Sequence, residues 1–188
     1  MNRAVVGLAL VCAAACSGAV RMPGAITPVV PTESFLWSAD RRLAWSDFQG
    51  PPDLSSVAVA ATAYVVVFGT SCEGSTFSST IESRFLPHAS WVKAQHLMQR
   101  ASAQTLLHEQ VHFDLSEVQV RRARQAVRAI ADPCSLSDQH FNEMFERFRV
   151  TETEVQQQYD RETGHGTNLD RQREWTAQVE RWLRELPQ

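Results

Sequence analysis

Two histidines four residues apart, with a glutamate beside the first, are the residues whose types and spacing point most directly to chemistry. They belong to the run His108-Glu109-Gln110-Val111-His112, which has the form H-E-x-x-H. Residues four apart on a helix lie on one face about 6 Å from each other, so both imidazoles can bind one cation. Glu109 would lie beside that face, where its carboxylate can take a proton from a metal-bound water. Because zinc lowers the pKa of such a water towards ~7, the run predicts a catalytic zinc site with Glu109 as general base.

A catalytic zinc needs a third protein ligand and one open position. His165 is the first candidate, because Gly164 and Gly166 on either side allow the backbone to bend and direct the ring. Glu143 and Glu146 are the alternatives, since they lie on the helix predicted after the motif helix. A zincin that uses a carboxylate would place its third ligand there. The sequence therefore predicts His165, or one of these two glutamates, as the third ligand.

Metal-bound imidazoles also need an acceptor for their second ring nitrogen, and nearby polar residues are candidates for such supporting roles. The candidates are Asp114, Glu117, Tyr159 and Asp160. At ~100° per residue, Glu117 points roughly 140° away from His112, so it cannot bind the same ion. Each carboxylate could instead form a salt bridge, as Glu117 could with Arg121 four residues on. Tyr159 could donate its hydroxyl to the oxyanion of carbonyl attack, or it could simply pack.

The motif lies in the first of three predicted helices. The segment from Ser102 to Ile130 has no glycine or proline, and its apolar residues recur at helical spacing. Ser137 or Asp138 can cap a second helix, which we expect from about Gln139 to Tyr159. A last helix is expected from about Asp170. These helices form the half of the protein that must position the metal ligands.

Two strands are predicted ahead of the helices. Ala58 to Gly69 is rich in β-branched and aromatic residues, and Thr76 to Phe85 alternates polar and apolar residues. Gly74 marks a turn between them, which places Cys72 close to that turn. The fold class expected is α+β: a small antiparallel sheet followed by a helical half that carries the zincin-like helix.

The N-terminus has the features of an export signal. Arg3 precedes an apolar stretch that ends in small residues and is too short to span a bilayer. The run from Ala13 to Cys16 resembles a lipobox, with Cys16 as the lipidated residue, although ordinary cleavage would use the same alanines. We therefore expect a signal peptide at 1–15, a proline-bearing tether at 16–34 and a single metallopeptidase domain at 35–188. The protein would be a periplasmic or outer-membrane lipoprotein, or alternatively a secreted protein.

Composition and cysteine number are consistent with an exported globular domain. Of 188 residues, 44% are hydrophobic and 21% are charged, and the net charge of −3 argues against a nucleic-acid partner. Outside the signal and the candidate lipid site, the cysteines are Cys72 and Cys134. An even pair in an oxidising compartment predicts a disulfide, the alternative being two unrelated thiols.

Two sequence blocks also resemble a known family. The run LLHEQVHFDLSE around the motif and YDRETGHG at Tyr159 to Gly166 are similar to the bacterial predicted secreted zinc-dependent proteases, which are catalogued as a family of unknown function. LAWSDFQGPP and Ser90-Trp91 add to the similarity, which spans roughly Leu43 to Gly166. The resemblance implies export and a zincin-like helix, and it supports His165 as a shared feature. It does not name a substrate.

These observations favour hydrolysis of amide bonds by a zinc-activated water. His108, His112 and His165 would hold the zinc, Glu109 would act as base, and the substrate would be a peptide or protein of the cell envelope. A zinc amidase acting on cell-wall peptides would use the same chemistry. The alternative from a different class is a non-catalytic envelope lipoprotein with a structural or vestigial metal site. Such a site would need four protein ligands, whereas the sequence offers three and leaves Glu109 unused.

Overall fold

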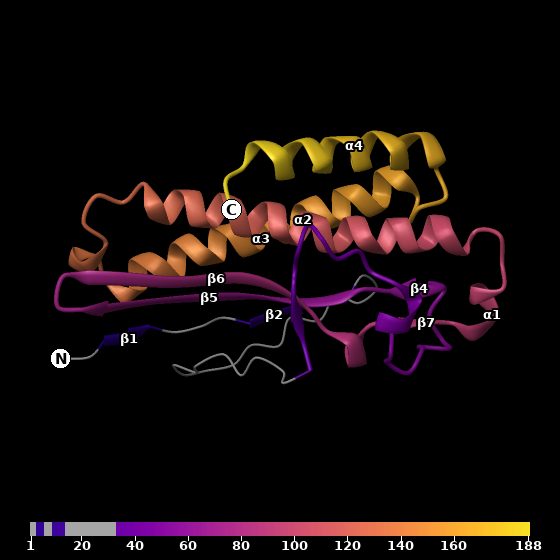
Figure 1. The fold of residues 1–188 in the computed structure, drawn as a ribbon, viewed down its shortest axis with the longest axis horizontal. Helices are drawn as coiled ribbons and strands as arrows, with labels where there is room; N and C mark the ends of the chain where they lie inside the picture. Colours follow the sequence, from indigo (N-terminus) through magenta and orange to yellow (C-terminus); the bar gives the residue numbers. More distant parts are fainter. Residues whose placement is uncertain (1–2, 6–8, 14–32) are drawn as a thin grey trace.

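In the computed structural model, a long β-hairpin lies along one side of a central helix, and two further helices cover its other sides (Figure 1). The structure describes residues 3–5, 9–13 and 33–188. The hairpin strands are β5 (Ala63–Glu73) and β6 (Thr76–Phe85). The helices are α2 (Ser102–Arg128), α3 (Asp138–Thr163) and α4 (Leu169–Glu185). A small antiparallel sheet followed by a helical half confirms the predicted α+β class.

The hairpin turns at Gly74, as the sequence predicts. Glu73 pairs with Thr76, so the loop has two residues, and Gly74 comes first with a φ of +62°. A positive φ at this position suits the right-handed twist of the flanking strands and requires no accommodation of a β-carbon. Strand β6 has the predicted bounds, whereas β5 continues four residues beyond the predicted end at Gly69.

Short elements extend the hairpin and connect it to α2. Strand β3 (Phe35–Leu36) pairs with β6, and β4 (Ala60–Ala61) pairs with β7 (Trp91–Val92) in a separate two-stranded sheet. The remaining elements are the 3-10 turns η1 (Trp45–Asp47), η2 (Pro87–Ala89) and η3 (Pro133–Ser135) and the one-turn helix α1 (Ala94–Leu97). Thr62, between β4 and β5, donates its hydroxyl to the Glu109 carbonyl and so ties this region to the motif helix.

Two strands fall in the segment predicted to be a signal peptide. β1 (Arg3–Val5) and β2 (Ala9–Ala13) pair antiparallel with β5. The predicted cleavage would remove both, so the mature sheet would consist of β5, β6 and β3. The predicted lipidation site, Cys16, and the predicted tether up to residue 32 lie outside the described residues. Within the described part, none of the helices combines the length and apolarity of a membrane span.

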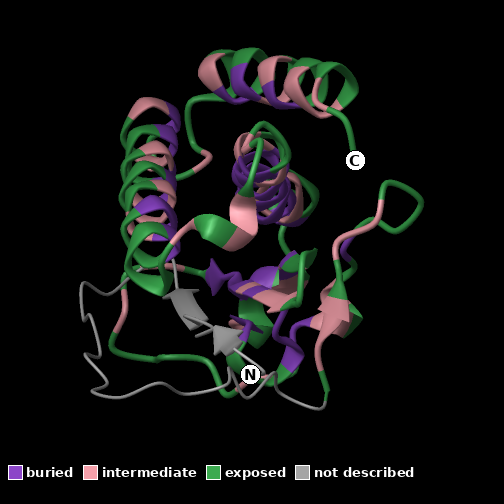
Figure 2. Cartoon of the chain, turned by 90° about the vertical axis from the view of Figure 1, so that its left-hand side faces the viewer, coloured by how far each residue is buried: buried purple, intermediate pink, exposed green. Residues whose placement is uncertain are grey.

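The middle of helix α2 is enclosed on all sides. Every residue from His108 to Arg121 is buried, and Figure 2 shows this helix between α3, α4 and the sheet. Towards the hairpin lies an aromatic core in which Phe68 stacks on Phe145 of α3 at 4.6 Å. Towards α3 and α4, apolar residues of α2 pack around Tyr159 and Trp175. The charged residues within this buried stretch must therefore find partners inside the protein, because an unpaired buried charge is very costly.

The predicted disulfide is present. Cys72 of β5 is bonded to Cys134 of η3, so it joins the turn end of the hairpin to the connection that follows α2. Of the two predicted caps for the second helix, Ser137 takes the role, because its hydroxyl accepts from the His140 amide. These contacts fix where α3 begins and therefore which of its residues face α2.

Candidate metal centre

Three side chains from two helices converge at the motif. His108 and His112 lie one turn apart on α2, and their Nε2 atoms are 3.1 Å from each other. Oδ1 of Asp160, on α3, lies 3.2 Å from Nε2 of His108 and 3.0 Å from Nε2 of His112. Within the described residues this group has the arrangement of a metal site. Both histidines are buried, and the Asp160 side chain keeps 17% of its surface exposed.

The size of this triangle fits a single divalent cation. Ligand atoms held at about 2.0–2.1 Å by one tetrahedral zinc lie roughly 3.3–3.4 Å from one another. The three observed separations, 3.0 to 3.2 Å, are within a few tenths of an ångström of that value. Two imidazoles and a carboxylate are hard-to-intermediate ligands suited to zinc and to other first-row divalent metals. The geometry supports a metal site and does not specify the ion.

Sequence reasoning placed Asp160 beside the ligands and His165 among them, and the structure differs. Helix α3 continues to Thr163, four residues beyond its predicted end at Tyr159, so Asp160 lies on the helix and faces α2. The His165 side chain is 76% exposed, and its Nδ1 lies 3.5 Å from Oδ1 of Asp160. Asp160 therefore completes the triangle, and His165 lies at its solvent side.

The loop that carries His165 has an unusual backbone. Gly164, His165 and Gly166 are successive residues in the left-handed region, with φ of +54°, +52° and +79°. Among the described non-glycine residues, His165 is the one with positive φ, a conformation that costs about 1–2 kcal/mol. Gly166 lies against the His108 ring, since a β-carbon there would be 3.0 Å from Cβ and Cγ of His108. The glycine predicted for its flexibility thus allows the loop to pack closely on His108.

Two glutamines that the sequence analysis did not single out contact the other ring nitrogens. Nδ1 of His112 lies 2.6 Å from Oε1 of Gln156, and Nδ1 of His108 lies 3.1 Å from Oε1 of Gln172. Both glutamines are buried. Gln156 is four residues before Asp160 on α3, and this helical spacing is the signal that identifies it.

Tyr159 packs within the site. Its ring stacks on that of His108 at 4.7 Å, and its hydroxyl donates to Oε1 of Gln172 at 2.8 Å. Burial, with the nearby charges of Glu109 and Asp160, raises its pKa well above the ordinary value for tyrosine. With its proton engaged by Gln172, Tyr159 orders the His108 surroundings, which agrees with the packing alternative considered from the sequence.

Charge interactions within the cluster are strong. Burial by itself lowers the pKa of His112, but hydrogen bonding and attraction to Asp160, with a smaller contribution from Glu109, raise it to about 9. Burial of Asp160 acts to raise its pKa, and the close contacts with the His108 and His112 rings overcome this and hold it well below its usual range. Without a metal, the cluster therefore holds a proton between His112 and Asp160 at neutral pH.

Glu109 is buried beside the cluster. It is 4% exposed, and its Oε2 has no hydrogen-bond partner within the described part of the chain. A buried carboxylate oxygen without a partner is costly unless a ligand, ion or water satisfies it. This oxygen is thus available to a group that enters the site, as the general-base assignment requires.

The other predicted supporting carboxylates bond elsewhere. Asp114 accepts from Nε1 of Trp37 at 2.8 Å and from Nε2 of Gln110 at 2.7 Å, and it pairs with Arg42. Neither it nor Glu117 contacts a ring nitrogen of the two histidines. On an enclosed helix the residues that point away from the metal need partners of their own, and for Asp114 these come from the segment after β3.

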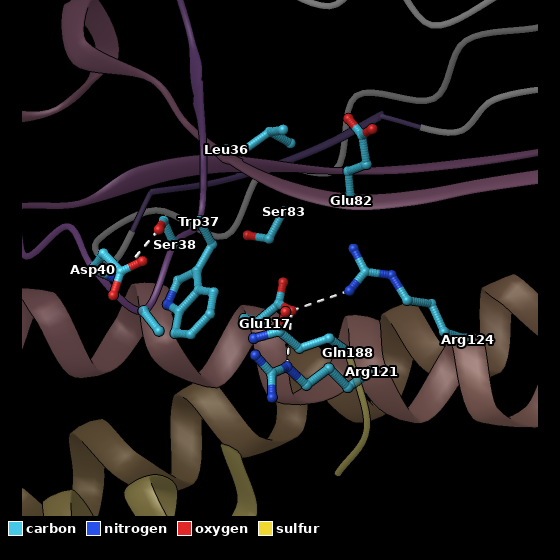
Figure 3. A pocket seen from close by; sticks show the side chains of 11 residues that line it. Leu36, Trp37, Ser38, Asp40, Glu82, Ser83, Glu117, Arg121, Arg124 and Gln188 are labelled. Atoms are coloured by element: carbon cyan, nitrogen blue, oxygen red, sulfur yellow. Dashed lines mark hydrogen bonds and ion pairs between the residues drawn. The ribbon is translucent and has the colours of Figure 1, made fainter. Parts of the chain in front are cut away.

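Glu117 lines a cavity of about 280 Å³ that lies further along α2 (Figure 3). Its carboxylate pairs with Arg121, as the salt-bridge alternative proposed, and also with Arg124. Trp37 also lines the cavity, beside Glu117. His108, His112 and Asp160 do not line this cavity. The carboxylate of Glu117 within it is already neutralised by the two arginines.

The glutamates considered as alternative third ligands are engaged on their own helix. Glu143 accepts from Gln139, and Glu146 pairs with Arg149. Both lie in the first half of α3, beside the aromatic core rather than beside the histidines. The candidate metal site lies against the second half of the same helix, which carries Asp160.

Comparison with known proteins identifies a family for this chain. Residues 48–166 match the family model described as bacterial protein of unknown function, DUF922. The chain belongs to the DUF922 family. Neither the search of curated proteins nor that of solved structures returned a match. Because the DUF922 description states no activity, the function has to be argued from the site.

The DUF922 region contains all three residues of the candidate metal site, which are His108, His112 and Asp160. It also includes Glu109 and Gln156, and it ends at Gly166, the residue packed on His108. Helix α4 and its Gln172 lie beyond the matched residues. The matched region thus supplies the three candidate ligand side chains, and α4 adds the acceptor for His108.

Proposed function

We propose that this protein is an exported zinc-dependent hydrolase that cleaves peptide bonds in peptides or proteins of the cell envelope. The observation that carries the proposal is the triangle of His108, His112 and Asp160 next to the buried, unpartnered Oε2 of Glu109. Two histidines and a carboxylate form the ligand set of a major class of zinc peptidases. A site with three protein ligands leaves a position for water, which favours catalysis.

Each side chain has a defined part in this proposal. His108, His112 and Asp160 would hold the zinc, which supplies Lewis acidity and acidifies a bound water. Glu109 would take the proton of that water and later deliver it to the leaving amine. His165, 3.5 Å from Asp160 on the exposed side, would face the approaching substrate in the catalytic site, and it would become a fourth ligand only in a closed, structural site.

Export is supported by the disulfide between Cys72 and Cys134. Disulfides persist in oxidising compartments such as the periplasm and are rare in the cytosol. Together with the signal sequence, this bond favours the cell envelope or the exterior. The attachment of a lipid at Cys16, or release as a soluble protein, are both compatible with the domain.

A non-catalytic, structural metal site is the second candidate. The burial of both histidines favours it, since a closed site has no exposed ligand position. It would require a fourth protein ligand, and His165 is the residue placed to provide one. His165 therefore separates the two candidates: it is dispensable for metal retention in a catalytic site and required in a closed one.

Metal content and hydrolysis measured together test the proposal. We expect mature wild-type protein to bind about one zinc per chain, as three convergent ligands imply. Asp160→Ala should lose the metal, His165→Ala should retain it, and Glu109→Gln should retain it while losing cleavage of a denatured-protein substrate. Elemental analysis after dialysis gives the metal content, and peptide release gives the activity.

The controls separate the possible failures. Glu143→Ala removes an exposed carboxylate on α3 and should change neither measurement. Loss of zinc in Glu109→Gln would make Glu109 a ligand and overturn its role as base. Loss of zinc in His165→Ala, with no hydrolysis by the zinc-loaded wild type, would establish the closed structural site instead.

A further inference from the structure

We propose that Gln156 and Gln172 are positioning residues that fix the tautomer and orientation of the two metal-binding imidazoles. The inference rests on the proposed metal site, and it concerns how the protein prepares that site. Each glutamine presents its amide oxygen to Nδ1 of one histidine, at 2.6 Å for His112 and 3.1 Å for His108. The Nε2 atom of each histidine is thereby directed towards Asp160 and towards the Nε2 atom of the other histidine.

The orientation of the Gln156 amide follows from its other contacts. Its Nε2 donates to the His112 carbonyl at 2.9 Å and to Oε1 of Glu152 at 3.0 Å. Because both amide hydrogens are used, the oxygen must be the atom that faces the His112 ring. A carbonyl oxygen can only accept, so Nδ1 of His112 carries the hydrogen, and in the neutral ring Nε2 keeps its lone pair for a metal.

Gln156 is itself held in place from the hairpin. The carboxylate of Glu152, one turn earlier on α3, also accepts the hydroxyl of Tyr64 from β5. A continuous chain of buried hydrogen bonds therefore runs from the sheet through Glu152 and Gln156 to His112. Fixed partners at both ends leave the amide little freedom to rotate.

Gln172 performs the same task from α4. Its Oε1 accepts from Nδ1 of His108 and from the Tyr159 hydroxyl, and its Nε2 donates to Oγ1 of Thr176 at 3.3 Å. The acceptor is again the oxygen, so the hydrogen of neutral His108 is also on Nδ1. Two separate helices thus impose the same tautomer on both ligands.

Neutral acceptors have a consequence that carboxylates would not. A carboxylate bonded to a ligand imidazole makes the ring more basic and adds negative charge to the centre. Asp160 and Glu109 already provide two carboxylates, enough to balance a divalent ion. Amide acceptors orient the rings without a further negative charge, which leaves the ion better able to polarise a bound water.

Zinc affinity of matched variants tests the inference. Gln156→Leu and Gln172→Leu remove the acceptor while retaining side-chain size, and each should weaken zinc binding about 10- to 100-fold in chelator competition. Gln157→Leu is the control, since Gln157 is the exposed neighbour on the same helix. Gln172→Glu restores an acceptor for His108, and the Thr176 hydroxyl can donate to the new carboxylate, so this variant should recover the affinity lost in Gln172→Leu. Far-UV circular dichroism verifies that each variant folds.

Nitrogen-15 NMR of the ring atoms supplies a readout that a purely structural role would not affect. In zinc-loaded wild type, both histidines should show a protonated Nδ1 and a metal-bound Nε2. Unchanged affinity in both folded leucine variants, or metal bound through Nδ1, would overturn the inference. If wild type binds no zinc, the proposed function fails. In that case the tautomer of neutral, zinc-free His112 still decides the role of Gln156.

Discussion

The pairing of His112 with Asp160 predicts how the stability of the metal-free protein depends on pH. In the folded state, attraction to Asp160 outweighs burial and raises the His112 pKa to about 9 from 6.5. A group whose pKa is raised by folding stabilises the protein fully below its unfolded pKa and ceases to do so above its folded pKa. We therefore expect the free energy of unfolding to fall as pH rises from about 6.5 to about 9.

The magnitude follows from the size of the shift. One pKa unit corresponds to ~1.4 kcal/mol, so the rise from 6.5 to about 9 corresponds to about 3 kcal/mol. Within that interval the unfolded state has lost one proton that the folded state keeps, so the slope is about −1.4 kcal/mol per pH unit. The depressed pKa of Asp160 reflects the same pairing and adds a separate loss only in acid, as pH falls through its folded value.

Urea unfolding in the presence of a chelator, followed by tryptophan fluorescence, measures this dependence. The measurements should stop near pH 9, the folded-state pKa of His112. At higher pH a second effect begins, because burial of Tyr159 destabilises the folded state once tyrosine in the unfolded state ionises at pH ~10. Asp160→Asn removes the charge that sustains the His112 pKa and should flatten the profile. Asp170→Asn, at an exposed aspartate paired with Arg173, should leave the profile unchanged.

Two results would refute the reasoning. If the free energy of unfolding of the wild type did not change between pH 6.5 and about 9, His112 would not be paired with Asp160 in the folded state. An equal fall in wild type and in Asp160→Asn would mean that some other group titrates. Saturating zinc should also abolish the fall, because the metal takes the place of the proton on His112.

Two further predictions concern backbone and covalent constraints. Gly166→Ala should weaken zinc binding roughly tenfold, because its β-carbon would press on His108. Gly74 also has a positive φ, but an added β-carbon there would meet open space. Gly74→Ala should therefore leave zinc binding unchanged and lower the free energy of unfolding by about 1–2 kcal/mol. Chelator competition measures zinc binding in both variants, and urea unfolding measures their stability. Replacing Cys72 and Cys134 by alanine should lower the free energy of unfolding by roughly 4 kcal/mol, given a sequence separation of 62 residues. Reduced wild-type protein should match that variant, and an unchanged urea midpoint in both would contradict the estimate.

The elements of this fold are largely predictable from local patterns. Alternation of polar and apolar residues and the glycine between them define β6 to the residue, and a run without glycine or proline defines α2. The disulfide was predicted from the two cysteines that remain outside the predicted signal peptide and lipidation site. In each case the physical cause acts within a short stretch of chain, so the sequence suffices.

Asp160, the third member of the candidate metal site, was harder to predict because its position depends on packing between helices. His165 has the residue type and the flanking glycines of a ligand, but these features do not specify where its side chain points. The segment after Tyr159 is compatible with helix, and Gly164 is where α3 ends. Because α3 extends to Thr163, Asp160 lies on the face of the helix that contacts α2, and His165 lies in the loop beyond the helix, on the exposed side.

The inner face of α3 shows how one helix can serve two purposes. Its buried residues recur at helical spacing along the whole length, first as the aromatic Phe141 and Phe145 and later as Glu152, Gln156 and Tyr159. Buried polar residues at core positions cost stability unless every one is bonded. The buried face of α3 changes from aromatic to polar residues along its length. Where it changes, the helix stops contributing to the aromatic core and starts to contribute residues to the candidate site. That change precedes Asp160 by two turns, and it identifies the second half of α3, rather than the glycine loop beyond it, as the partner of the H-E-x-x-H helix.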